Sequence, residues 1–127
     1  FLYGESPNRF NIFYTKEISV YDGDKLIAFS LFDIGKMAVA SILCVFDEAY
    51  SKYSLGYFTM MEEIIYAKEH GFKYYYPGYI LDHSNAFNYK LKMGKYDYYD
   101  GERWRAHENF NAEKLDSNLI VNRLKEY

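Results

Sequence analysis

The chain has 127 residues, of which 50% are hydrophobic and 21% are aromatic. This composition and length predict one folded domain over residues 1–127 and exclude an intrinsically disordered chain. The net charge of -3 argues against a broad nucleic-acid-binding surface, and the single cysteine excludes an internal disulfide and a cysteine-cluster metal site.

The first part of the chain predicts three strands. Residues 1–15 are polar and aromatic and form a leading segment. Residues 17–21 and 25–32 flank Asp22-Gly23-Asp24, a sequence typical of a β-hairpin turn. Residues 37–46 form an almost wholly apolar run, so we expect a central strand that is covered on both faces.

A long helix is predicted over residues 54–70. Ser54 occupies the N-cap position, and Gly71 follows His70 as a helix stop. The expected inner face has apolar residues at helical spacing: Tyr57, Met60, Met61, Ile64 and Ala67. The glutamates of the helix are expected to face outward: Glu62, Glu63 and Glu69.

Residues 72–76 predict a strand one short loop after this helix. The segment 37–76 therefore predicts a β-α-β unit, which favours parallel strands and a right-handed crossover. Further along, the pattern predicts a helix from residues 82–85 to Gly94, a hairpin over 96–106 and a C-terminal helix over 115–124. This order predicts an α/β fold in which a mixed β-sheet is packed against helices.

Two places in the first half of the chain are candidates for chemistry. Ser54, Leu55 and Gly56 open the long helix, and a helix N-terminus offers N–H groups and positive partial charge to an anion. An ordinary N-cap with a tight turn explains the same residues. Asp33 follows an apolar strand and could orient an amine or accept its proton, whereas the simpler interpretation is a turn aspartate.

Tyrosines surround Pro77-Gly78 at the end of the strand predicted after the helix. They are Tyr74, Tyr75, Tyr76 and Tyr79. Because Pro77 cannot donate a ladder hydrogen bond, pairing should fail near it, and a splayed strand end is where α/β sheets open to ligands. Tyr76, Gly78 and Tyr79 are therefore expected to line a cleft, although a half-exposed, tyrosine-rich sheet end would look the same.

The second predicted helix carries Tyr89 and Lys90, next to the proposed cleft. Lys90 is a plausible partner for a phosphate or a carboxylate, and a solvated lysine is the alternative. Together with Tyr89 it would form one wall of the cleft.

These motifs, in this order, resemble the C-terminal domain of arginyl-tRNA–protein transferases and equally the bacterial aspartate/glutamate leucyltransferases. The resemblance runs over about residues 17–104 and rests on four segments: Tyr21–Asp33, Cys44–Ile80, Asn88–Lys90 and Tyr98–Trp104. It implies a GNAT-like fold and the transfer of Arg or Leu from aminoacyl-tRNA to a protein N-terminus, which marks the protein for degradation.

The resemblance also implies the site residues and partners. Asp33 and Tyr79 would be catalytic, with Asp33 orienting an amine. The substrate-binding positions would be Ser54, Leu55, Gly56, Tyr76, Gly78, Tyr89 and Lys90. The partners would be aminoacyl-tRNA and a protein or peptide N-terminus, with no cofactor, no metal and no membrane. No apolar run reaches the roughly 18 residues that a membrane span needs. The location would be cytoplasmic, and the single cysteine suits a reducing cytosol.

Two other functions fit parts of the sequence. One is a GNAT acyltransferase that uses acyl-CoA, but the segment Lys52–Phe58 has one glycine where the pyrophosphate loop needs two small residues. The other is a non-catalytic module that binds a peptide or tRNA. Ala86-Phe87, standing where the family has Lys-Met, favours that module.

Overall fold

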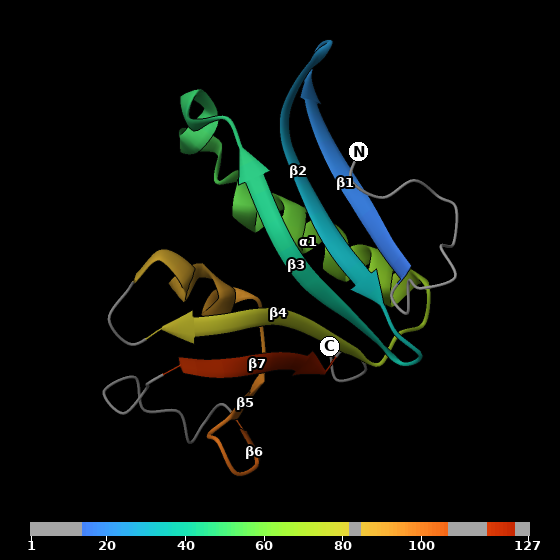
Figure 1. Ribbon diagram of the computed structural model, residues 1–127, viewed down its shortest axis with the longest axis vertical. Coiled ribbons are helices and arrows are strands. Elements are labelled where there is room, and N and C mark those ends of the chain that lie inside the picture. The colour runs from blue at the N-terminus through green and yellow to red at the C-terminus, as the bar shows by residue number, and fades with distance from the viewer. Residues whose placement is uncertain (1–13, 82–84, 107–116, 124–127) are drawn as a thin grey trace.

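The computed structural model describes residues 14–81, 85–106 and 117–123 (Figure 1). Within these ranges the chain forms a seven-stranded mixed sheet in the order β1-β2-β3-β4-β7-β5-β6. The elements in chain order are β1 (Tyr14–Asp22), β2 (Lys25–Ile34), β3 (Ala38–Phe46), η1 (Glu48–Tyr53), α1 (Leu55–Glu69), β4 (Tyr74–Leu81), η2 (Asn85–Lys92), β5 (Asp97–Tyr99), β6 (Trp104–Ala106) and β7 (Ser117–Arg123). The helix α1 packs against β1 to β4 and lies behind the first three strands in Figure 1.

The predicted hairpin and β-α-β unit are confirmed. Strands β1 and β2 pair antiparallel around Gly23, whose φ of 57° suits a glycine in a tight turn. The strand β2 pairs antiparallel with β3, and β3 pairs parallel with β4 after the α1 crossover. Because parallel neighbours need a long connection, the helix between them follows from the same pattern.

The parallel strands β3 and β4 separate soon after they meet. Their pairing covers only Ala38–Ala40 on β3 and Tyr74–Tyr76 on β4. The register between β4 and β7 also shifts between Tyr75 and Gly78, around Pro77. The predicted loss of pairing at Pro77 is therefore confirmed, although β4 continues to Leu81 along β7. Figure 1 shows β3 and β4 running apart beyond this point.

The separation explains why one expectation about β3 is wrong. The strand lies inside the sheet as predicted, but it is not covered on both faces. Large apolar side chains in its second half are exposed: Ile42, Leu43, Val45 and Phe46. The neighbouring strand β4 has moved away along this half, so it brings no side chains to cover it.

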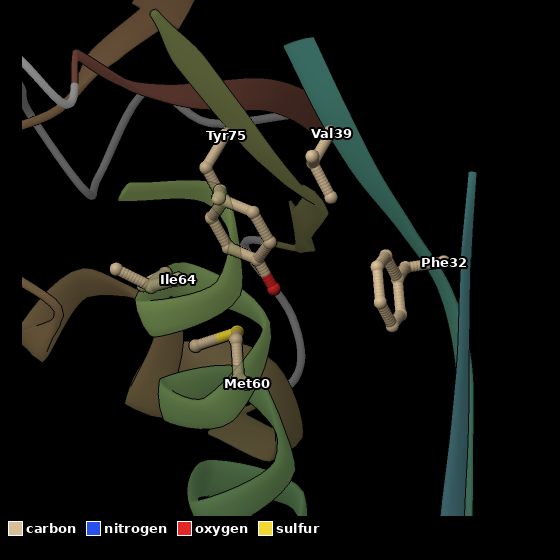
Figure 2. Close-up of a cluster of buried hydrophobic side chains, with 6 residues drawn as sticks. Phe32, Val39, Met60, Ile64 and Tyr75 are labelled. Carbon is tan, nitrogen blue, oxygen red and sulfur yellow. The ribbon is translucent and has the colours of Figure 1, made fainter. Parts of the chain in front are cut away.

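The main core lies between α1 and the paired part of the sheet (Figure 2). Phe32 of β2, Val39 of β3 and Tyr75 of β4 face Met60 and Ile64 of α1, and all of them are buried. Burying a side chain of this size contributes about 1.5–3 kcal/mol. The core therefore anchors the sheet at the point from which β3 and β4 separate.

Two predicted helices differ in the structure. The C-terminal helix is wrong, because residues 117–123 form the strand β7 between β4 and β5. The other helix is present as the 3-10 helix η2 over Asn85–Lys92, while its predicted cap at residues 82–84 lies outside the described residues. The hairpin near the end is confirmed as β5 and β6. None of the helices in the described ranges is long and apolar enough to cross a membrane.

Candidate active site

The start of α1 has free hydrogen-bonding capacity. Ser54 is the N-cap residue, as predicted, but it has left-handed backbone angles (φ 52°, ψ 50°) and its side chain makes no capping hydrogen bond. The first helical hydrogen bond runs from Phe58 N–H to Ser54 C=O at 3.0 Å. The N–H groups of residues 55–57 therefore have no acceptor within the helix and can bind an anion.

The 3-10 helix η2 reaches this helix start through Tyr89. The Tyr89 hydroxyl lies 3.6 Å from the position that a Cβ on Gly56 would occupy. The ring also packs against the main core, and burial raises the pKa of Tyr89. The structure thus brings together two of the predicted substrate-binding positions, the opening of α1 and Tyr89.

Lys90 lies against the irregular part of β4. Its Nζ donates a hydrogen bond to the Tyr79 carbonyl oxygen at 3.1 Å. The same Nζ lies 3.3 Å from the position of a Cβ on Gly78, whose φ is 95°. Gly78 therefore permits both the backbone conformation and the close approach of Lys90. Burial lowers the pKa of Lys90, and the charge of Glu63 acts in the opposite direction.

Glu63 is a buried residue of α1, and its predicted outward orientation is wrong. The side chain is 0% exposed. Its Oε2 accepts a hydrogen bond from the Tyr75 hydroxyl at 2.6 Å. Its Oε1 has no hydrogen-bond partner among the described residues, and neither does the hydroxyl of the buried Ser30.

The surroundings of the Glu63 carboxyl group act on its pKa in opposite directions. Desolvation raises the pKa, and this is the largest effect. The Tyr75 hydroxyl opposes it most strongly, followed by the hydroxyls of Ser30 and Ser41 and the charge of Lys90. Ser30 is thus close enough to favour the carboxylate electrostatically, although it does not meet hydrogen-bond geometry with it. The net effect is a raised pKa.

A spacing signal for the burial of Glu63 was present in the sequence. Glu63 lies four residues after Thr59 and four before Ala67, and all three are buried. Residues at this spacing share one helix face. The expected inner face is confirmed at Met60, Ile64 and Ala67, which are buried, whereas Tyr57 is exposed. The buried face of α1 extends from these residues to include Glu63.

Cys44 of β3 completes this group of polar side chains. The Thr59 hydroxyl donates to its Sγ at 3.4 Å. Burial raises the pKa of the Cys44 thiol, and the charge of Glu63 raises it further. A raised pKa disfavours the thiolate, so Cys44 is poorly suited to act as a nucleophile. We call Ser30, Ser41, Cys44, Thr59, Glu63, Tyr75, Tyr89 and Lys90 the polar cluster.

Asp33 and Tyr76 lie on the other face of the sheet. Phe32 and Tyr75 face α1, so the alternation of side chains places Asp33 and Tyr76 on the opposite face. Both pair with Ala40, which puts them in one row, about 10 Å apart on strand spacing alone. The Thr15 hydroxyl donates a hydrogen bond to the Asp33 carboxylate. The rings of Tyr76 and Trp104 pack edge-on, with 6.0 Å between their centroids.

The predicted residues therefore fall into two groups on opposite sides of the sheet. In the first group, Tyr89 lies against the opening of α1, and the next residue, Lys90, lies against Gly78 and the Tyr79 carbonyl group. Asp33 and Tyr76 form the second group. Within the described ranges, no three His, Cys, Asp or Glu side chains are placed to hold a metal ion together.

In the mixed sheet, the parallel strands β3 and β4 separate, and α1 begins beside the space where they separate. This arrangement is the GNAT fold. The structure is similar to an acetyltransferase from Bacillus cereus, with a TM-score of 0.61 and 12% identity over 88% of this chain and 74% of that one. It is also similar to the ribosomal-protein-S18-alanine N-acetyltransferase from Escherichia coli, with a TM-score of 0.63 and 14% identity over 87% of this chain and 69% of that one. At these identities the likeness concerns the fold.

Residues 4–100 match the family described as "Arginine-tRNA-protein transferase, C terminus". The chain belongs to this family. An aspartate/glutamate leucyltransferase from Campylobacter jejuni is 36% identical over 74 residues, which are 58% of this chain and 31% of that protein. Arginyl-tRNA–protein transferase 1 from Saccharomyces cerevisiae is 33% identical over 78 residues, which are 61% of this chain and 15% of that protein. The chain thus spans about a third or less of the length of these relatives.

Proposed function

We propose that this domain takes part in transferring an amino acid, Arg or Leu, from aminoacyl-tRNA to the N-terminal amine of a protein, as an N-degron tag. The family match over residues 4–100 carries the proposal. Named relatives act as a leucyltransferase and as an arginyl-tRNA–protein transferase, which supports these two donors. The proposed partners are charged tRNA and a protein or peptide N-terminus, so the proposed location is the cytoplasm.

In this reaction the acceptor α-amine attacks the ester carbonyl that links the amino acid to the tRNA. The C–N bond forms, the C–O bond to the ribose breaks, and the amine proton leaves as the ribose oxygen gains one. The protein has to bring the two substrates together and assist the proton transfer. No covalent enzyme intermediate is needed.

We assign the donor to the α1 side of the sheet. The opening of α1 supplies the N–H groups of residues 55–57, and Lys90 supplies a positive charge beside Gly78. Both suit the phosphates near the tRNA 3′ end. Tyr89 packs against Gly56 and supports this wall, and Tyr79 adds an exposed ring next to the carbonyl group that Lys90 binds.

We assign the acceptor amine to the opposite face. Asp33 is half-buried there, in the same row as Tyr76, and its carboxylate can orient an ammonium group or accept a proton. The two substrates would then meet through the space where β3 and β4 separate. The hydrogen bond from Thr15 gives the Asp33 carboxylate a fixed orientation.

A transfer assay tests this proposal. Labelled Arg or Leu on tRNA is supplied with peptides that begin with Asp, Glu or a neutral residue, and incorporation into the peptide is measured. Asp33→Asn should reduce turnover at least tenfold, whereas Asp24→Asn in the exposed β1–β2 turn should leave it unchanged. Absence of incorporation by the folded full-length protein, together with a rise in melting temperature on adding coenzyme A, would instead identify an acyl-CoA enzyme.

A further inference from the structure

We propose that the rings of Tyr76, Tyr99 and Trp104 bind an apolar or aromatic side chain of the acceptor peptide, at its third or fourth residue, while its N-terminal ammonium group lies at Asp33. The inference rests on the function proposed above, because it concerns the acceptor of that reaction. Peptide binding itself can be tested without any transfer activity. We call Tyr76, Tyr99 and Trp104 the aromatic surface.

Trp104 lies between the other two rings of the aromatic surface. It packs edge-on against Tyr76 and at a tilt against Tyr99, with 6.0 Å and 5.5 Å between the ring centroids. Tyr99 and Trp104 are also paired across β5 and β6, which places their side chains on one face of the hairpin. Trp104 is nevertheless 41% exposed, and Tyr99 is exposed as well. Much of this aromatic area is therefore free to be covered by a ligand.

The turn of the β5–β6 hairpin restrains the backbone around Trp104. The Asp100 carboxylate accepts hydrogen bonds from the N–H groups of Glu102 and Arg103, at 3.0 Å and 2.9 Å. It also pairs with the side chain of Arg105. Asp100 thus ties down the residues on both sides of Trp104. Fixing a ring before the ligand arrives lowers the entropy cost of binding.

The distance from Asp33 to the aromatic surface fits a short stretch of extended peptide. Ala40 pairs with both Asp33 and Tyr76, so the three residues form one row across the sheet. The middle residue of the row has only a methyl side chain. Asp33 and Tyr76 are about 10 Å apart on strand spacing, and an extended peptide advances about 3.3 Å per residue. A peptide that starts at Asp33 and crosses this row therefore brings its third or fourth residue to Tyr76.

The chemistry at the two ends of the row favours a peptide N-terminus as the occupant. The Asp33 carboxylate attracts an ammonium group and repels the phosphates of RNA. The aromatic surface gains most from an apolar or aromatic side chain that covers the rings. A positive amine with such a side chain a few residues further on satisfies both ends. A nucleobase could stack on the same rings, so RNA is the occupant that the experiment must exclude.

Trp104 is the single tryptophan of the 127 residues, and its fluorescence therefore reports on the aromatic surface. The full-length protein is titrated with alanine-based hexapeptides that begin with Asp and carry one Phe at the second, third, fourth or fifth position. The emission of Trp104→Phe is subtracted to isolate the signal. Peptides with Phe at the third or fourth position should change the emission and bind about tenfold more tightly than a peptide without Phe.

Acetylating the peptide N-terminus tests the role of Asp33 in the same titration. Without the ammonium group the best peptide should bind about tenfold more weakly, because Asp33 loses its charged partner. Equal affinity for the free and acetylated peptides would overturn the proposal. Equal affinity for all positions of Phe would overturn it as well.

A pair of variants tests Trp104, with binding measured from the anisotropy of a dye on the C-terminus of the peptide. Trp104→Ala should abolish the preference for Phe at the third or fourth position. Tyr21→Ala removes an exposed ring from the β1–β2 hairpin and should leave the preference unchanged. Melting temperatures establish that both variants fold. A purely structural role for Trp104 would lower the melting temperature but keep the preference. If Trp104→Ala does not fold, the titrations of the wild-type protein still decide.

The transfer assay then links the aromatic surface to the reaction. The KM for the peptides should follow the same order as their affinities, and Trp104→Ala should leave the KM for charged tRNA unchanged. A rise in the KM for charged tRNA alone would assign the surface to the donor and overturn the proposal. If the wild-type protein binds the peptides in the expected order but transfers no amino acid, the proposed function fails and the peptide site stands. Transfer without any preference at the third or fourth residue would keep the function and refute the site.

Discussion

The contact between Gly78 and Lys90 gives a sharp test of the donor wall. In Gly78→Ala the new methyl group would lie 3.3 Å from Lys90 Nζ. This contact is a few tenths of an ångström too close, so the flexible lysine must move. The movement costs little energy, but it disturbs the 3.1 Å hydrogen bond to Tyr79. The backbone at φ 95° adds strain of about 1–3 kcal/mol.

Gly101→Ala is the matched control for backbone strain. Gly101 has a φ of 99°, but a Cβ at this position would meet no atom within 4 Å. Both variants should therefore lose stability, by about 1–3 kcal/mol in urea denaturation. Only Gly78→Ala should also raise the KM for charged tRNA, by roughly tenfold. Equal donor KM values in the two variants would refute the reasoning, because they would show that the position of Lys90 has no effect on donor binding.

Three further predictions concern stability and reactivity. Phe32→Ala should reduce the free energy of unfolding by about 3–5 kcal/mol because Phe32 is 1% exposed, whereas Ile42→Ala, at an exposed position, should change it by less than about 0.5 kcal/mol. If urea denaturation gave comparable losses of unfolding free energy for the two variants, the core would not lie where we place it. Gly56→Ala should be neutral or should raise the melting temperature, because the new Cβ would meet the Tyr89 hydroxyl at an ordinary 3.6 Å and alanine favours a helix by up to about 1 kcal/mol. A clear fall in melting temperature would contradict that packing. The thiol of Cys44, whose pKa is raised by burial, should react with a disulfide reagent more slowly than free cysteine at pH 7, and rapid labelling of the folded protein would count against its burial.

Local patterns in the sequence were enough to predict the order of the first elements. Asp22-Gly23-Asp24 supplies the residues that a tight turn needs, and the apolar segments on both sides supply the strands. Two strands separated by a long helix imply parallel pairing. Pro77 lacks an N–H group, so the loss of regular pairing near it followed from covalent chemistry.

Candidate residues could be selected from the sequence, but their grouping could not. Gly56 and Tyr89 are distant in the chain and meet because η2, which packs against β4, brings the Tyr89 hydroxyl to the start of α1. Asp33 and Tyr76 share the opposite face because both pair with Ala40. The face on which a strand residue lies depends on which neighbour faces the core, and that depends on how the helix docks.

Tertiary structure decided two features that we predicted wrongly from local pattern. The helical spacing of Leu115, Leu119 and Leu124 predicted a helix, yet residues 117–123 form β7, because pairing with β4 on one side and β5 on the other outweighs local preference. Glu63 seemed suited to solvent because it is charged. The groups that act on its carboxyl group, Tyr75, Ser30, Ser41 and Lys90, come from four separate elements and come near it only when the sheet and helices are assembled.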